Sequence, residues 1–284
     1  MESETLASGI TDQVLASFPA IPDSRLKEVM RALIRHLHLF AKEVQLNEAE
    51  WAAGVDFLTR TGHISSGERQ EFILLSDVLG LSMLVDEISN PVSGEVTAST
   101  VFGPFYSGKQ SVLSAGATIL KRDEPAGRLL NVCGTIGDSE GTPIEGALME
   151  VWQTAPNGLY DVQDADQPSG HLRGSFLTDE RGAYAFRTIS PVSYRIPNDG
   201  PVGDLLGALG RHPWRPAHIH FMISAPGYRT LVTHLFVGDD PYLESDAVFG
   251  VKDSLVVHPS QQSGEDRLSY DFRLVRCPAQ LREN

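Results

Sequence analysis

The feature that most constrains the fold of this 284-residue chain is a change of texture near Pro91. Before that point, apolar residues recur at three- and four-residue steps, which is the stripe of an amphipathic helix. The clearest stripe runs over Ser24–Gln45, and Pro22 with Asp23 marks its start. The first hundred residues are therefore expected to be mainly helical.

Two further helix starts are expected in the same part of the chain. Asn47 with Glu50 and Ser65 with Glu68 both resemble capping boxes, in which the first side chain and the one three residues later satisfy each other's backbone amides. The first box predicts a second helix. The second predicts a third helix that carries its apolar residues at Phe72, Leu75, Leu79, Leu81 and Leu84.

After Pro91 the sequence turns to short apolar or alternating runs separated by Gly, Pro, Asp and Asn. This pattern is typical of an antiparallel β-sandwich. We expect a helical domain over residues 1–100 and a sandwich over residues 101–284, with Val101–Tyr106 as a bent loop. The expected strands are Leu129–Ile136, Ala147–Gln153, Gly174–Thr178, Ala183–Ile189, His218–Ile223, Leu231–Val237, Ser254–Val257 and Leu268–Val275.

Composition narrows the range of partners. The formal net charge of −14 and the pI near 5.0 argue against nucleic acid and against an anionic membrane surface. The N-terminus lacks the pattern of a secretory signal and no run is apolar enough to span a bilayer, so we expect a cytoplasmic protein. Two cysteines, Cys133 and Cys277, fit neither a disulfide scaffold nor a thiolate metal site, and we expect both to be buried.

The pattern His-x-His occurs twice, with opposite meanings. A helix advances about 100° per residue, so His36 and His38 point apart and cannot share a metal ion. On a strand, residues i and i+2 lie on one face about 7 Å apart, so His218 and His220 can converge on one ion. The alternative for the second pair is two ordinary buried histidines satisfied by hydrogen bonds.

The surroundings of His218 favour a metal site. Trp214-Arg215-Pro216 places a cation and an aromatic ring directly before the pair, which is costly in a plain core. A cupin would need an acidic ligand where Ser224 stands, and too few residues follow for an amidohydrolase barrel. A zinc site of the Cys-His type lacks its thiolates.

The remaining ligands must then be oxygen donors. The carboxylates of this half lie mostly in turn-like sequence, and tyrosine is the other candidate. A phenolate suits Fe(III), whose charge holds the oxygen deprotonated far below its free pKa of about 10. For any single tyrosine, a half-buried ring with a solvated hydroxyl is the common alternative.

Three segments resemble the signature sequences of the intradiol catechol dioxygenases, and the resemblance covers nearly the whole chain. They are Pro156–Tyr160 (PNGLY), Tyr194–Pro197 (YRIP) and Trp214–His220 (WRPAHIH). The resemblance implies a β-sandwich catalytic domain behind a helical dimerisation domain. It also implies one Fe(III) per subunit, held by Tyr160, Tyr194, His218 and His220.

In this family the iron binds an aromatic diol and O2 cleaves the ring between the two hydroxyl-bearing carbons. By resemblance, Tyr194 is the ligand that leaves the metal, and Arg215 stabilises negative charge that develops on the ring. The family further implies a homodimer through the N-terminal helices and, in some members, a bound phospholipid.

Within the family the sequence resembles the hydroxyquinol-cleaving members most. Asp77 would accept a hydrogen bond from the third ring hydroxyl, and His234 stands where catechol-specific members carry glutamine. We expect His234 beside the iron rather than on it. The alternatives are catechol or chlorocatechol as substrate and, from another class, a metal-free sandwich that binds carbohydrate or protein. The expected substrate contacts are Leu74, Asp77, Val101, Phe102, Gly103, Pro104, Phe105, Ile196, Pro197, Arg215, His234 and Val248.

Overall fold

The computed structural model describes residues 9–18, 23–67, 69–91, 95–262 and 265–277. The chain packs as two compact units, residues 1–60 and 61–284. This division lies before the boundary expected near residue 100, because the last two helices of the N-terminal part pack within the second unit. The expected functional division at residue 100 stays a prediction.

The first unit is helical, as predicted. It contains α1 (Ile10–Ala16), α2 (Ser24–Glu43) and most of α3 (Glu48–Ile64). Asp23 caps α2 by accepting hydrogen bonds from the next turn, and the capping box before α3 is confirmed. There the Asn47 side chain accepts from the Glu50 amide at 3.0 Å, and the Glu50 carboxylate accepts from the Asn47 amide at 3.1 Å.

The expected third helix is wrong in its start and in its continuity. α3 runs to Ile64, so Ser65 follows a helix instead of opening one, and Glu68 lies outside the described residues. The next helix, α4, begins six residues later and is separate from α5 (Glu71–Val78 and Leu81–Ser89). Gly80 separates them with φ of +75°, a left-handed conformation that ends one helix and redirects the chain.

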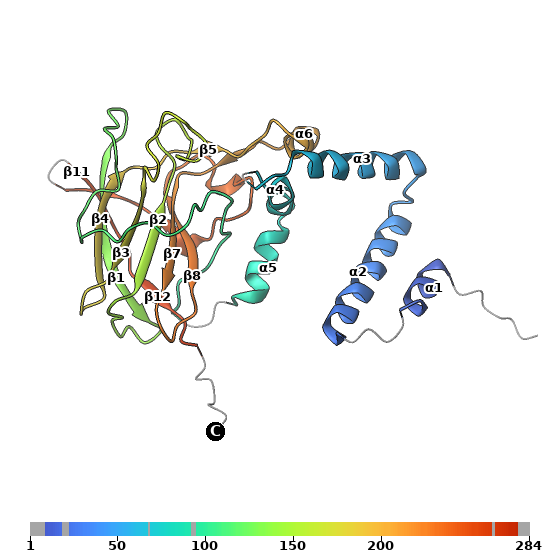
Figure 1. Ribbon diagram of the computed structural model, residues 1–284, viewed down its shortest axis with the longest axis horizontal. Helices are drawn as coiled ribbons and strands as arrows, with labels where there is room; N and C mark the ends of the chain where they lie inside the picture. Colours follow the sequence, from blue (N-terminus) through green and yellow to red (C-terminus); the bar gives the residue numbers. More distant parts are fainter. Residues whose placement is uncertain (1–8, 19–22, 68, 92–94, 263–264, 278–284) are drawn as a thin grey trace, which may run out of the picture. The chain divides into compact units, whose positions relative to one another are not determined.

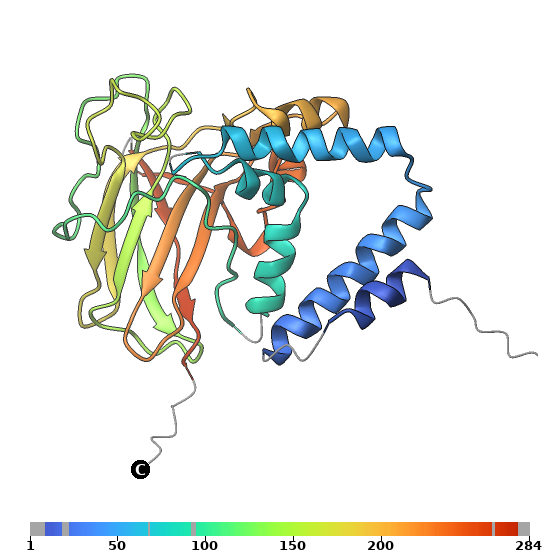
Figure 2. The same ribbon diagram turned by 45° about the vertical axis from the view of Figure 1, so that its right-hand side comes forward.

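Two sheets face each other in the second unit, as the separate layers of arrows in Figures 1 and 2 show. In the first sheet, β1 (Leu129–Asp138) pairs on one side with β4 (Ala183–Ile189) and on the other with β11 (Glu265–Ser269) and then β12 (Phe272–Leu274). β10 (Ser260–Gln262) extends this sheet beside β11.

The second sheet carries the candidate site. Its order is β3-β2-β7-β8-β9, and the bounds are Arg173–Leu177, Leu148–Trp152, His218–Ser224, Leu231–Val237 and Val256–Val257. A separate ribbon joins β5 (Tyr194–Arg195) to β6 (Trp214–Arg215). The short helices η1 (Leu243–Ser245) and η2 (Asp253–Leu255) lie in the segment before β9.

The sandwich prediction is confirmed, with three corrections. The sheets are mixed, because β1 pairs in parallel with β11 and β12, and β8 pairs in parallel with β9. The expected strand Leu268–Val275 is broken where the Tyr270 carbonyl crowds Gly134, so closely that a Cβ on that glycine would lie 1.8 Å away. The expected strand Ser254–Val257 is extended only over its last two residues, because η2 occupies its start.

A helix also interrupts the sandwich sequence where none was expected. α6 (Pro201–Ala208) is eight residues long and contains two glycines, which are unfavourable inside a helix. Proline near its first turn favours the start. The Glu71 carboxylate of α4 accepts a hydrogen bond from the Val202 amide at 3.1 Å and so ties α4 to this helix.

The hydrophobic core lies between the two sheets. Because alternate residues of β7 fill this core, the histidines of β7 point away from it. Ile219, Phe221 and Ile223 point into the main apolar cluster and are fully buried. Met222 packs instead against Trp152, Tyr160 and Tyr194 on the opposite face. The period of two along a strand therefore places His218 and His220 on that opposite face, as predicted.

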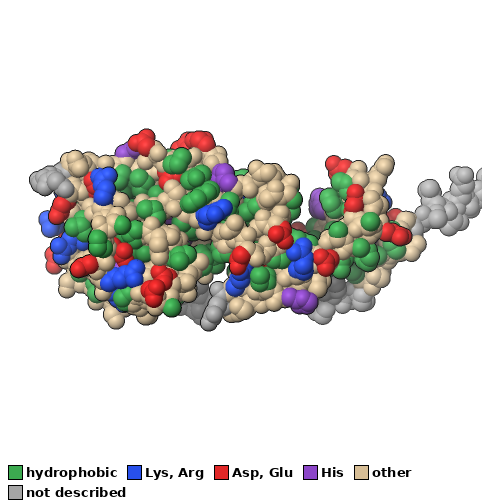
Figure 3. All heavy atoms as spheres, turned by 90° about the horizontal axis from the view of Figure 1, so that it is seen from above, with side chains coloured by type: hydrophobic (Ala, Val, Ile, Leu, Met, Phe, Trp, Pro, Cys, Tyr) green, Lys and Arg blue, Asp and Glu red, His purple; other side chains and the backbone are tan. Residues whose placement is uncertain are grey.

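Surface charge and the exposure of the two cysteines can be compared with the expectations from the sequence. On the face drawn in Figure 3, Lys and Arg side chains are interspersed with Asp and Glu. No helix among the described residues is long and apolar enough to cross a membrane. The expectation of two buried cysteines is wrong, since Cys277 is exposed and Cys133 is partly exposed, and both are free thiols.

Candidate metal centre

The two histidines of β7 bring their Nε2 atoms together, and the His220 Nδ1 is buried without a hydrogen-bond partner among the described residues. Both side chains are 2% exposed. The His218 Nδ1 lies 2.7 Å from the Pro216 carbonyl, to which it donates. This bond fixes the tautomer and leaves Nε2 of His218 as the unprotonated donor.

Two tyrosines bring their hydroxyls to the same point from other elements. Tyr160 follows the turn after β2, and Tyr194 lies on β5. The Tyr160 Oη is 2.8 Å from His220 Nε2 and 3.3 Å from Tyr194 Oη, and the two imidazole Nε2 atoms are 3.2 Å apart. The four side chains expected from the resemblance are therefore brought together.

These spacings fit a bound metal ion. Two ligand atoms about 2.0–2.1 Å from one first-row ion, at angles of 90–109°, lie about 2.8–3.4 Å apart. Two phenol oxygens and two imidazole nitrogens suit Fe(III), because two phenolates offset most of its charge. The residues present thus fit the iron that the resemblance implies.

Burial keeps the two histidines neutral and therefore able to bind a cation, and it keeps Tyr160 protonated until a cation arrives. Burial and the charges of His218 and Arg215 lower the pKa of His220 well below its usual value, and the pKa of His218 falls to about 3. Burial and the neighbouring Tyr194 raise the pKa of Tyr160, while Arg215 and Arg173 oppose that rise. A metal cation would therefore displace phenol protons as it binds.

His234 belongs to the same cluster. Together with His218 and His220 it forms the one group of three possible metal-ligating side chains found among the described residues, with ligand atoms within 4.8 Å of one another. Its Nδ1 lies 3.5 Å from Arg215 Nη2, so the same guanidinium contacts both His218 and His234. That His234 stays off the metal remains a prediction.

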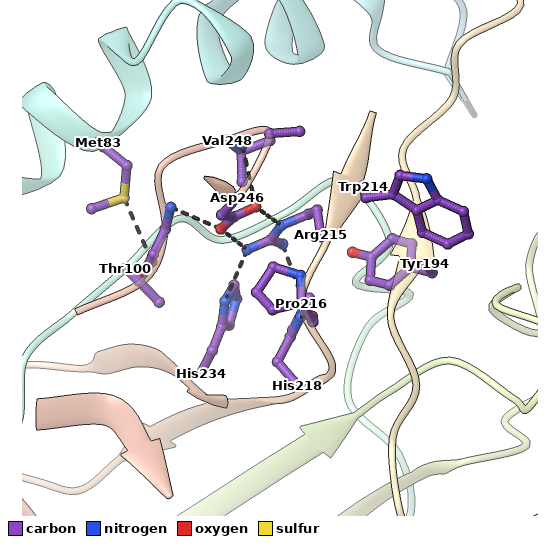
Figure 4. A network of polar contacts seen from close by, with 12 residues as sticks. Met83, Thr100, Tyr194, Trp214, Arg215, Pro216, His218, His234, Asp246 and Val248 are labelled. Atoms are coloured by element: carbon purple, nitrogen blue, oxygen red, sulfur yellow. Dashed lines mark hydrogen bonds and ion pairs between the residues drawn. The ribbon is translucent and has the colours of Figure 1, made fainter. Parts of the chain in front are cut away.

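Arg215 connects this cluster to a carboxylate that the sequence did not single out. As Figure 4 shows, its guanidinium lies between Asp246 on one side and His218 and His234 on the other. Nε and Nη2 donate to the two Asp246 oxygens at 3.0 and 3.2 Å, and both side chains are almost fully buried. Burial tends to raise the pKa of Asp246, but Arg215 outweighs it and the pKa is lowered.

A cavity of 430 Å³ adjoins the cluster. Phe105 forms part of its wall and stacks on the Tyr160 ring at a centroid distance of 4.7 Å. Five of the expected substrate contacts line this cavity: Leu74, Pro104, Phe105, Ile196 and Pro197. They come from α4, the Val101–Tyr106 loop and the segment after β5, so the loop bends as predicted around this opening.

The other expected contacts lie around the cluster rather than on the cavity wall. Gly103 has φ of +75°, and a Cβ there would lie 3.1 Å from the His220 ring, so only glycine fits easily at this point. Val101 and Val248 are buried, and the Val248 amide donates to Asp246 at 3.3 Å. Phe102 is 42% exposed and packs edge-on against Tyr106.

Asp77 is not a solvated helix residue. It is 5% exposed on α4. Burial raises the pKa of its carboxyl, while a hydrogen bond from Ser82 and the charge of Arg215 lower it in part. A buried carboxylate within electrostatic reach of Arg215 is suited to meet a polar ligand group.

Comparison with known proteins assigns the chain to one family. A family model described as "Dioxygenase" matches residues 101–276, and one described as "Catechol dioxygenase N terminus" matches residues 23–97. The chain belongs to the intradiol ring-cleavage dioxygenases. Membership implies non-haem iron, aromatic diol substrates and O2.

Similar proteins cover this dioxygenase almost end to end. The 6-chlorohydroxyquinol 1,2-dioxygenase of Cupriavidus pinatubonensis is 48% identical over 93% of this chain and 96% of its own length. The hydroxyquinol 1,2-dioxygenase of Nocardioides simplex is 49% identical over 90% of this chain and 86% of its own. The structure of hydroxyquinol 1,2-dioxygenase from Pseudomonas putida DLL-E4 gives a TM-score of 0.89 at 48% identity, covering 94% and 98%.

Proposed function

We propose that this dioxygenase opens hydroxyquinol between its two adjacent hydroxyl-bearing carbons to give 3-hydroxymuconate, or its tautomer maleylacetate. One Fe(III) per subunit would be held by Tyr160, Tyr194, His218 and His220. The observation that carries the proposal is the convergence of these four donor atoms at 2.8–3.3 Å beside a cavity of 430 Å³. The iron would withdraw electrons from the bound ring and so make the ring reactive toward O2.

The protein's own groups orient the substrate and handle its protons. Tyr194 lies on a two-residue strand and meets Tyr160 edge-on at 5.7 Å. It would hold the iron as a phenolate, and we assign it as the ligand that would leave the metal and accept a substrate proton. Arg215 is fixed by Asp246 with its Nη1 3.3 Å from His218 Nε2. A fixed cation at that point stabilises negative charge on the ring without reorganisation during the reaction.

Substrate choice is assigned to Asp77. Its buried carboxylate can accept a hydrogen bond from the third hydroxyl of hydroxyquinol, and catechol leaves it without that partner. The alternative substrates are catechol and chlorocatechol. The names of the relatives support hydroxyquinol and its 6-chloro derivative as the first compounds to assay.

The decisive measurement compares kcat/KM for hydroxyquinol, catechol and 4-chlorocatechol in wild type and Asp77→Ala. A hydrogen bond to a charged group is worth roughly 1.5–3 kcal/mol, so the variant should lose about tenfold to a hundredfold on hydroxyquinol. It should lose little on catechol, or gain, because catechol gives the buried carboxylate no further hydrogen bond and its removal relieves a desolvation cost. An equal fall on both substrates would show that Asp77 only supports the helix.

We also propose that the helices of residues 1–100 form a homodimer and that their apolar surface holds phospholipid. Within the first unit, α2 exposes a stripe of large apolar side chains, which a partner or a lipid would cover. Light scattering should give twice the chain mass, and solvent extraction of the purified protein should release phospholipid. A monomer without lipid would refute both. The exposed side chains are Leu26 (50%), Leu33 (53%), Leu37 (57%) and Phe40 (52%).

A further inference from the structure

A row of four buried side chains crosses the second sheet through the candidate metal centre. Strand register places Trp152 opposite both Arg173 and His220, and His220 opposite His234. All four are 4% exposed or less. The Trp152 ring stacks on the His220 ring at 4.7 Å with an interplanar angle of 14°. The sheet thus carries contacts from Arg173 on β3 to the histidines on β7 and β8.

Arg173 is held at the end of this row next to a tyrosine of the centre. Its Nε donates to the Asp161 carboxylate at 2.6 Å, and the two side chains are 3% and 4% exposed. Its guanidinium carbon lies 5.8 Å from the centroid of the Tyr160 ring. Asp161 follows Tyr160 directly in sequence and also accepts from the Gly170 amide, so the ion pair is anchored beside this ring.

Stability is a weak reason for an arginine at this place. A buried ion pair recovers its desolvation cost only when its hydrogen bonds are complete. The Arg173 Nη2 is buried, yet it has no hydrogen-bond partner among the residues that the structure describes. An apolar side chain between Trp152 and Tyr160 would avoid that cost, which points to a role for the charge itself.

The two tyrosines of the centre therefore have different surroundings. Tyr160 is stacked on Phe105 and lies beside the Arg173 cation. Tyr194 meets Tyr160 edge-on and has a tilted contact with the His218 ring at 5.4 Å. A cation near a phenolate stabilises the electron pairs of its oxygen. This weakens the donation of that oxygen to a metal ion.

We propose that Arg173, anchored by Asp161, is a positioning residue that sets how strongly the Tyr160 phenolate donates electrons to the bound iron. This rests on the proposed function, because it requires iron at the centre. The positive charge lowers the energy of the Tyr160 donor orbital and so raises the energy of its charge-transfer transition to the iron. Asp161 partly offsets that charge, so the two residues act in opposite directions.

The test is the position of the visible tyrosinate-to-iron band in the resting, substrate-free enzyme. Arg173→Met removes the cation and should move the band to longer wavelength. Asp161→Asn leaves the cation less compensated and should move it to shorter wavelength. Arg173→Lys keeps the charge and should stay close to wild type.

A second arginine of this chain provides a matched control. Arg276 also pairs with a buried carboxylate, that of Asp138, and its guanidinium carbon lies 5.7 Å from the ring of Tyr228. Arg276→Met removes an arginine that is itself 62% exposed from a tyrosine outside the candidate centre, so it controls for loss of an arginine–carboxylate pair in general. Its band should stay at the wild-type wavelength.

The possible outcomes distinguish failure of the proposed function from failure of the role proposed for Arg173. A wild-type protein that binds iron without a visible band, or binds none, would overturn the proposed function itself. A coloured wild type whose Arg173→Met and Asp161→Asn variants keep its wavelength, or move in the same direction, would overturn the role of Arg173. Should Arg173→Met fail to fold, Asp161→Asn decides alone, and an unchanged or longer wavelength counts against the proposal.

Discussion

Loss of the ion pair between Arg215 and Asp246 should strongly lower the stability of the folded protein. Asp246 receives both Nε and Nη2 of Arg215, and its oxygens also accept from the backbone amides of Val248 and Gly250 at 3.3 and 2.9 Å. Asp246→Ala removes all of these at once. It leaves a guanidinium that is 3% exposed without its counter-charge, next to His218 and His234.

The size of the effect follows from this burial. Removing one partner of a buried ion pair costs roughly 3–5 kcal/mol, because the remaining charge stays desolvated. In a unit of 150–250 residues, each kcal/mol shifts Tm by about 2–4 °C, so the expected fall is about 6–20 °C. Because the pKa of Asp246 is lowered by folding, the pair contributes fully above the unfolded pKa and is lost as pH falls through the folded value.

Thermal and urea unfolding of the iron-free protein at pH 7 measure this cost directly. Arg181→Ala is the control, since its pair with Asp179 at 3.8 Å lies at the surface, with side chains 88% and 48% exposed. An exposed pair of this kind contributes about 0–1 kcal/mol. Asp246→Asn keeps the size of the side chain and should fall between the two. If Asp246→Ala lost no more stability than the control, the large contribution of this ion pair to the free energy of unfolding would be refuted.

Three other outcomes are expected. Tyr160→Phe should lose most bound iron and the visible band, because an anionic ligand is removed, and full iron and colour in the variant would exclude Tyr160 from the site. The double variant His36→Ala/His38→Ala should keep its iron, since α2 turns these rings apart, and iron loss with intact circular dichroism would contradict the helix argument. In the iron-free protein, folding lowers the pKa of His218 to about 3, from about 6.5 in the unfolded chain. The free energy of unfolding should therefore decrease as the pH is lowered from 6.5 to 3, by about 1.4 kcal/mol per pH unit. Equal urea midpoints at pH 7 and pH 5 would contradict that.

Much of the fold was readable because its signals are local. Period and capping predicted α2 and α3, since both depend on residues three or four apart. Strand period alone placed His218 and His220 on one face and Ile219 on the other. The family resemblance then added two tyrosines that no spacing argument could have chosen, and the structure brings all four donors together.

What the sequence could not determine depends on contacts between distant segments. The break after Ser269 lies where the Tyr270 carbonyl approaches Gly134 of the neighbouring strand β1, and no property of residues 268–275 predicts it. In the sequence Asp246 is an ordinary loop carboxylate, and only the fold brings it into contact with Arg215, 31 residues away. Arg173 precedes the strand expected at Gly174–Thr178, and only the fold places it across from Trp152 and beside Tyr160. Sequence alone determined which residues share a face, because that is a property of one strand or helix. Tertiary structure decided which faces meet, because burial and charge pairing act between elements that the chain brings together only when it folds.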